Sequence, residues 1–141
     1  MDEVDLLHND HVLLGSQVAH VVALIKSLEQ NPSLTVPLFA ELTRQVDLLR
    51  QQLTEHFAFE EAQSFPTLAA NFPNAGPRLE QLRQQHGLIL GLFEELRASL
   101  QTTCELDLAT AVACSVRLES NFAGHVTAET ELLRGLSLGS G

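Results

Sequence analysis

The stretch at residues 41–60, ELTRQVDLLRQQLTEHFAFE, carries the pattern from which the fold can be inferred. Its apolar residues recur at alternating steps of three and four, which keeps them on one side of an α-helix. The same side continues into His56 and Glu60, where leucines would normally stand. A polar side chain in a helical core costs free energy unless a partner satisfies it. This stretch therefore predicts a helix that carries two polar residues into a shared, satisfied cluster.

Three further stretches repeat the pattern, so we expect helices over about residues 4–28, from about residue 37, over 79–100 after a turn at 71–77, and over 108–132. Each places residues of metal-binding types on its apolar side. The full set is His11, His56, Glu60, His86, His125 and Glu129. Buried ionisable residues are uncommon unless they are paired or bind a metal. One shared metal site explains all six.

Prolines and glycines suggest where the helices are interrupted. Pro32 is expected to end the first helix, and Pro66 to kink or end the second, because proline disfavours the helical conformation in the residue before it. Gly87 and Gly91 lower the helical propensity of the third helix, and we interpret them as marks of a close helix–helix approach. The tail at residues 138–141 is expected to be frayed.

Four amphipathic helices with short connections indicate an all-α fold, an up-down-up-down antiparallel four-helix bundle. We expect a single domain over residues 1–141. His11 and His86 lie near the starts of their helices, whereas His56 and His125 lie towards the ends of theirs. Antiparallel packing would bring all four to one level of the bundle.

The composition disfavours several classes of function. With 18 acidic and 8 basic residues the net charge is −10, so we expect neither nucleic acid nor membrane as a partner. Cys104 and Cys114 would lie about 15 Å apart on one helix, too far for a disulfide, and we expect small buried residues there. No apolar run suggests a membrane span and the first residues are acidic, which favours the cytoplasm. Phosphate-binding loops and CxxC motifs are absent from the sequence.

The spacing of the acids indicates the chemistry of the site. Glu60 follows His56 by four residues and Glu129 follows His125 by four, so both side chains of each pair point the same way. A carboxylate can bridge two cations, and imidazole suits iron and zinc alike. The set therefore suits two divalent cations a few ångströms apart.

The sequence resembles the hemerythrin-like (HHE) domains. Residues 56–68, HFAFEEAQSFPTL, match the HFxxEExxxFPxL block of that family, and the resemblance continues with the pairs Asp10-His11 and Gln85-His86 and with residues 124–129, GHVTAE. It implies a non-haem di-iron centre with two iron ions in a four-helix bundle. It also implies that the carboxylates of Glu60 and Glu129 bridge the irons and that the four histidines are terminal ligands.

The chain departs from the oxygen-carrying members at two points. Those proteins have an HxxxH pair on the third helix, and Leu90 stands at the second position here. They also place the acid of the fourth helix five residues after its histidine, where this chain has Thr130. The resemblance thus implies one histidine ligand fewer, with its position left to water, Glu61 or His8.

These features favour a binding protein for dioxygen or a related small ligand, acting in sensing, storage or delivery. One alternative is a di-iron enzyme that acts on peroxide or nitric oxide, and another is a protein that handles or responds to iron. Whether the protein is an enzyme stays open, and no protein partner can be inferred. The chain has no tyrosine or tryptophan, which removes the usual side-chain radical carriers.

Several residues are expected to play no direct part at the site. His20 falls off the apolar side and should be exposed, and Glu55, Gln84 and Gln85 should belong to the helix surface. The phenylalanines expected to pack around the site are Phe57, Phe59, Phe93 and Phe122.

Overall fold

The computed structural model describes residues 3–31, 33, 35–100 and 108–139, and the side chains of residues 10–31, 33, 37–100 and 108–136. Cys104 and the side chain of His8 therefore lie outside the described part. Cys114 is buried, as expected.

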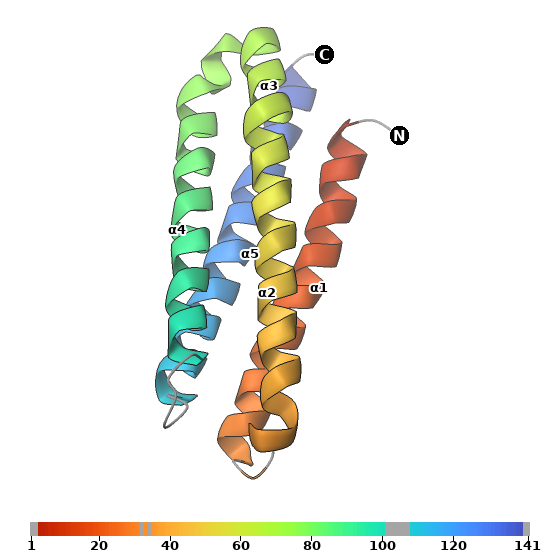
Figure 1. Cartoon of the computed structure of the whole chain (residues 1–141). Coiled ribbons are helices and arrows are strands. Elements are labelled where there is room, and N and C mark those ends of the chain that lie inside the picture. The colour runs from red at the N-terminus through yellow and green to blue at the C-terminus, as the bar shows by residue number, and fades with distance from the viewer. Residues whose placement is uncertain (1–2, 32, 34, 101–107, 140–141) are drawn as a thin grey trace.

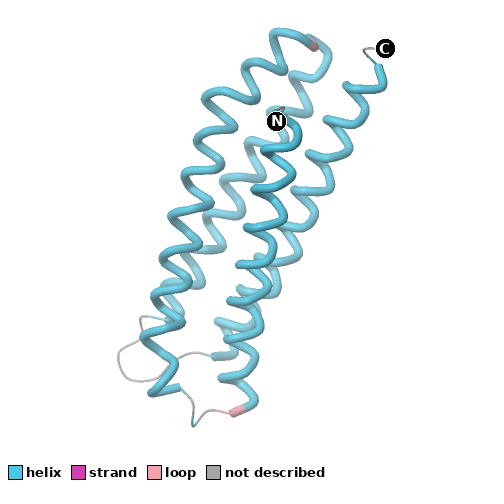
Figure 2. The backbone as a smooth tube through the Cα atoms, turned by 90° about the vertical axis from the view of Figure 1, so that its right-hand side faces the viewer, coloured by secondary structure: helices cyan, strands magenta, loops and turns pink. Residues whose placement is uncertain are grey.

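Helices make up nearly all of the described chain, as Figure 2 shows. The long ones are α1 (Glu3–Gln30), α2 (Thr35–Phe59), α4 (Gly76–Leu100) and α5 (Leu108–Gly139). Between α2 and α4 lie a π-helix, η2 (Glu60–Ser64), the short α3 (Phe65–Asn71) and a 3₁₀ turn, η3 (Pro73–Ala75). The predicted all-α class is confirmed.

The four long helices lie side by side (Figure 1). Each contacts two others, in the cyclic order α1, α2, α4, α5. The start of α1, the short α3 and the end of α5 lie at the same end of the molecule, which is the upper end in Figure 1. This ring of contacts encloses one long apolar interior.

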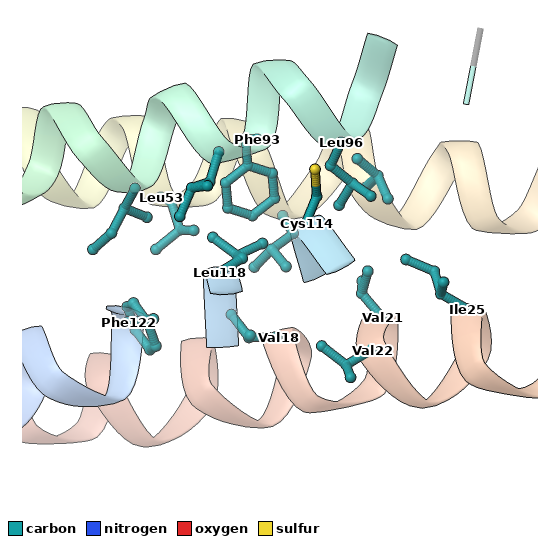
Figure 3. Packing of buried hydrophobic residues seen from close by; sticks show 14 of the residues in the cluster. Val18, Val21, Val22, Ile25, Leu53, Phe93, Leu96, Cys114, Leu118 and Phe122 are labelled. Atoms are coloured by element: carbon teal, nitrogen blue, oxygen red, sulfur yellow. The ribbon is translucent and has the colours of Figure 1, made fainter. Parts of the chain in front are cut away.

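The apolar interior consists of two clusters of buried side chains. The larger is built by all four long helices, and Figure 3 shows its side chains pointing toward one another, among them Val18, Leu53, Phe93 and Leu118. The smaller cluster lies nearer to α3 and contains Phe65, Ala75, Leu79, Leu82 and Leu132. Burial of these residues follows the steps of three and four in the sequence and supplies most of the stability of the helices.

The helical path does not end at Pro66, which was one of the two outcomes that we expected. The backbone N–H of Phe65 donates to the carbonyl oxygen of Glu60, the i→i+5 bond of a π-turn, and Pro66 then occupies the first turn of α3. The first turn tolerates proline because its N–H groups have no partner within the helix. Residues 35–71 thus form one continuous helical path.

Two other expectations were wrong. Gly87 and Gly91 are exposed, and a Cβ atom added at either would have no neighbour within 4 Å, so neither marks a close helix–helix approach. Helix α5 continues through Leu138 and Gly139, the first half of the tail that we expected to be frayed, whereas Ser140 and Gly141 lie outside the described residues.

One helical stretch, Asp10–Gln30, is long and apolar enough to cross a membrane by length and composition alone, which our sequence analysis did not expect. The test is weak because the core helix of a soluble protein passes it too. Val18, Val21 and Ile25 of this stretch are buried in the larger cluster.

Candidate metal centre

All six predicted site residues meet in a polar layer between the two apolar clusters. His11 comes from α1, His56 from α2, Glu60 from the first position of η2, His86 from α4, and His125 and Glu129 from α5. None is more than 7% exposed. On each helix the layer falls between residues of the larger cluster and the end of the bundle that holds the smaller one. Each of the four long helical paths therefore contributes to one buried cluster.

Each carboxylate reaches histidines from two different helices. Glu60 Oε1 lies 3.1 Å from His56 Nε2 and 3.3 Å from His86 Nε2. Glu129 Oε1 lies 3.6 Å from His11 Nε2, and its Oε2 lies 3.3 Å from His125 Nε2. Both acids thus stand between histidines of two different helices.

The ligand atoms fall into two overlapping groups. One contains Glu60, His86, His125 and Glu129, and the other contains His11, His56 and Glu60. Within each group the nitrogen and oxygen atoms lie within 4.8 Å of one another. Glu60 belongs to both. This geometry offers two adjacent cation positions with one carboxylate in common.

Buried polar atoms without partners provide a test of whether a metal fits. Among the described residues, Nε2 of His56, His86 and His125 and both carboxylate oxygens of Glu60 and Glu129 are buried without a hydrogen-bond partner. Buried polar groups are otherwise nearly always satisfied. A cation held between these nitrogens and oxygens would satisfy them together, so the cluster fits a metal site.

The two buried acids cannot both be ionised without a cation. Burial raises the pKa of Glu129 well above its ordinary value, and the neighbouring Glu60 adds to the rise. Burial also acts against ionisation of Glu60, but the neighbouring side chains of His56, His86 and Glu129 outweigh it and lower the pKa of Glu60. The pair therefore holds one proton, on Glu129.

The pKa values of two of the histidines, His56 and His125, are shifted in opposite directions. Burial would lower the pKa of His56, but the carboxylates of Glu60 and Asp10 outweigh it and raise that pKa. Burial, with the nearby His86, lowers the pKa of His125 to about 3. His125 is therefore neutral and able to bind a cation over the whole physiological range, whereas a proton competes more strongly with a cation at His56.

Two residues orient the histidines from outside the cluster. The Nδ1 atom of His56 lies 3.3 Å from Asp10 Oδ2, and that of His125 lies 2.7 Å from Gln85 Oε1. Our assignment of Gln85 to the helix surface was wrong. Gln85 directly precedes His86, just as Asp10 directly precedes His11. This shared position before a site histidine was the feature of the sequence that could have indicated a role for Gln85.

Aromatic rings enclose His86. Phe57 stacks on it with ring centroids 3.9 Å apart, and Phe65 lies on it at 5.5 Å. Phe93 and Phe122 are buried in the larger cluster. Phe59 is 41% exposed, so the expectation that it shields the site was wrong.

The positions that depart from the oxygen-carrying proteins leave the cluster unchanged. Leu90 is partly buried against the larger apolar cluster. Glu61 Oε2 lies 3.4 Å from His86 Nδ1, on the side of the ring away from Glu60, so it does not take the place of a missing ligand. His20 and Glu55 are exposed, as expected.

Two surface cavities reach the outer sides of the orienting pairs. One, of about 300 Å³, lies between α1 and α2 and is lined by Asp10, Glu55 and His56 among others. The other, of about 350 Å³, lies between α4 and α5 and is lined by Gln85, Asn121 and His125 among others. Each cavity therefore reaches one histidine of the buried cluster together with the residue that orients it.

Comparison with known proteins gives the family. The sequence matches the family described as hemerythrin HHE cation binding domain over residues 2–136. Comparison with curated proteins gave no match, and comparison with solved structures gave none. Proteins of this family bind metal cations, commonly iron, and the buried histidine and glutamate cluster fits such a site. The chain belongs to the hemerythrin HHE cation-binding domain family.

Proposed function

We propose that this protein holds two iron ions and binds dioxygen or a related small ligand for sensing, storage or delivery. The observation that carries the proposal is the pair of overlapping ligand groups that share Glu60. His11 and His56 would hold one ion, and His86 and His125 the other, with Glu60 and Glu129 between them. The proposal also takes the bundle as up-down-up-down and the protein as cytoplasmic, in keeping with its acidic charge.

Bound iron would supply redox chemistry and open coordination positions for a small ligand. The chain itself would position the metal ligands, exclude water, and hold or release one proton. Phe57 and Phe65 both stack on the ring of His86, which limits the entry of water. Glu129, whose carboxyl holds the proton of the acid pair, must release it when a cation binds.

The test is the visible spectrum of protein loaded anaerobically with Fe²⁺, recorded as oxygen is admitted and then removed. A band that appears with oxygen and disappears on its removal supports a carrier or sensor. A band that persists as oxidised iron rejects reversible binding and favours an enzyme acting on peroxide or nitric oxide, or a protein that handles iron.

Metal content provides the companion measurement. The Glu60→Ala variant should lose most of its bound iron, because it removes the carboxylate common to both ligand groups. The matched control is Glu55→Ala, which removes an exposed acid five residues earlier and should keep the wild-type metal content. Equal iron content in the two variants would contradict the ligand assignment.

A further inference from the structure

The polar layer is built from two halves with the same plan. In the half made by α1 and α2, His11 is preceded by Asp10, which contacts the histidine of the His56–Glu60 pair on the neighbouring helix. In the half made by α4 and α5, His86 is preceded by Gln85, which contacts the histidine of the His125–Glu129 pair in the same way. The paired residues lie 46 and 40 positions apart in the sequence.

Asp10 and Gln85 occupy corresponding places but differ in charge. An ionised aspartate can only accept a hydrogen bond, so the Nδ1–H of His56 donates to it. Gln85 presents its amide oxygen to Nδ1 of His125, so that ring carries its hydrogen on the same atom. In both halves Nε2 is left with its lone pair towards the carboxylate of its own helical path, 3.1 Å away for His56 and 3.3 Å for His125.

The acceptor outside the cluster affects how strongly the ring binds a cation. A carboxylate that accepts from one imidazole nitrogen increases the basicity of the other nitrogen, and a neutral amide does so less. Glu61 does not make up the difference in the second half. Its Oε2 lies 3.4 Å from Nδ1 of His86, the other histidine of that half, but His86 Nδ1 has no hydrogen-bond partner among the described residues, so no imidazole N–H of the second half donates to Glu61 as His56 does to Asp10.

We infer that Asp10 and Gln85 are corresponding positioning residues of two half-sites. Because Asp10 is charged and Gln85 is not, the α1–α2 half-site binds a divalent cation more tightly than the α4–α5 half-site. The inference rests on the proposed two-metal function. It assigns an order of filling, in which the position beside His11 and His56 is occupied first. It also assigns a role to two residues that touch neither cation.

The test is an anaerobic titration of the full chain with Co²⁺ in competition with a coloured chelator. His86→Ala removes a ligand of the α4–α5 half-site, and His11→Ala removes one of the α1–α2 half-site, so each variant isolates the other position. On the His86→Ala background, Asp10→Asn should weaken Co²⁺ binding about 10- to 100-fold, the usual effect of losing such a partner. On the His11→Ala background the same change should have little effect, whereas Gln85→Glu should strengthen binding.

The matched control is Glu55→Gln, which removes one negative charge from the same cavity; the Glu55 carboxylate accepts a hydrogen bond from Gln51. Asp10 is more than half exposed, so its substitution should not unfold the bundle. An effect of Glu55→Gln as large as that of Asp10→Asn, or an equal effect of Asp10→Asn on both backgrounds, would overturn the inference.

A second measurement needs neither histidine variant. In the otherwise intact chain the two stepwise Co²⁺ constants should be unequal, and either Asp10→Asn or Gln85→Glu should bring them closer together. Two equal constants that neither change affects would overturn the inference while leaving the two-metal function intact. Absence of Co²⁺ binding by the wild-type chain would instead overturn the proposed function itself.

Discussion

Replacing Glu129 by glutamine should stabilise the metal-free protein. Burial and the nearby Glu60 raise the pKa of Glu129 to about 10, from an ordinary value of 4.5. At pH 7 the unfolded chain has lost this proton and the folded chain has kept it, so folding must take up a proton. Each pH unit between 4.5 and 7 costs about 1.4 kcal/mol, which gives a total penalty of roughly 3 kcal/mol.

Glutamine has the shape of the protonated acid and removes this penalty. Its amide N–H can donate to Glu60, as the protonated carboxyl does. With chelator present at pH 7, Glu129→Gln should therefore exceed the wild-type free energy of unfolding by about 3 kcal/mol. The sign follows from the raised pKa, because wild-type stability is lost as the pH rises above the unfolded value of 4.5. The two proteins should have nearly equal stability at about pH 4.5.

The assay is urea unfolding followed by circular dichroism in excess chelator, at both pH values. Glu131→Gln, an exposed change on the same helix, is the control and should stay within about 0.5 kcal/mol of wild type. Loading with Fe²⁺ should reverse the order, because glutamine cannot replace an anionic bridge. A variant that is no more stable than wild type in chelator at pH 7 would refute the reasoning.

Three further outcomes are expected. The apparent affinity for Co²⁺ should fall as the pH is lowered from about 8 to about 5, because the raised pKa of His56 makes a proton compete with the cation there. A competition titration that shows the same affinity over this range would contradict histidine ligation. Gly91→Ala should raise the free energy of unfolding, measured with urea, by roughly 0.5–1 kcal/mol, because the site is exposed, helical and open around the added Cβ. A loss of stability would show that the glycine is needed. Leu53→Ala should lower the free energy of unfolding by about 2–5 kcal/mol in the same assay, because Leu53 is fully buried in the larger cluster. A decrease below about 1 kcal/mol would mean that this core is loosely packed.

The helices and the cluster could be predicted because each leaves a periodic trace in the sequence. His56 and Glu60 continue a row of leucines, so their burial follows from the same spacing that predicts the helix. The layer that they form with the other four residues was predicted from the antiparallel packing that we expected. Their role as ligands remains a prediction.

What could not be predicted depends on contacts between helices or on a choice between backbone hydrogen bonds. Gln85 lies beside the apolar row, and only the position of α5 shows that its amide meets His125. Pro66 has no backbone N–H, and either a break in the helix or a π-turn can accommodate that loss. The structure has the π-turn, and Phe65 packs into the smaller cluster there. The exposed glycines of α4 have no partner helix to explain them, and nothing in the structure accounts for their presence.

The polar layer also determines how many units the bundle unfolds in. It separates the smaller apolar cluster, near α3, from the larger one by a band of ionisable side chains. Such an interruption allows one end of a protein to open while the rest stays folded. Without a cation, amide hydrogens of α3 should thus exchange sooner than those beside the larger cluster. A cation held by residues of α1, α2, η2, α4 and α5 would tie both parts together, so metal occupancy would turn two cooperative units into one.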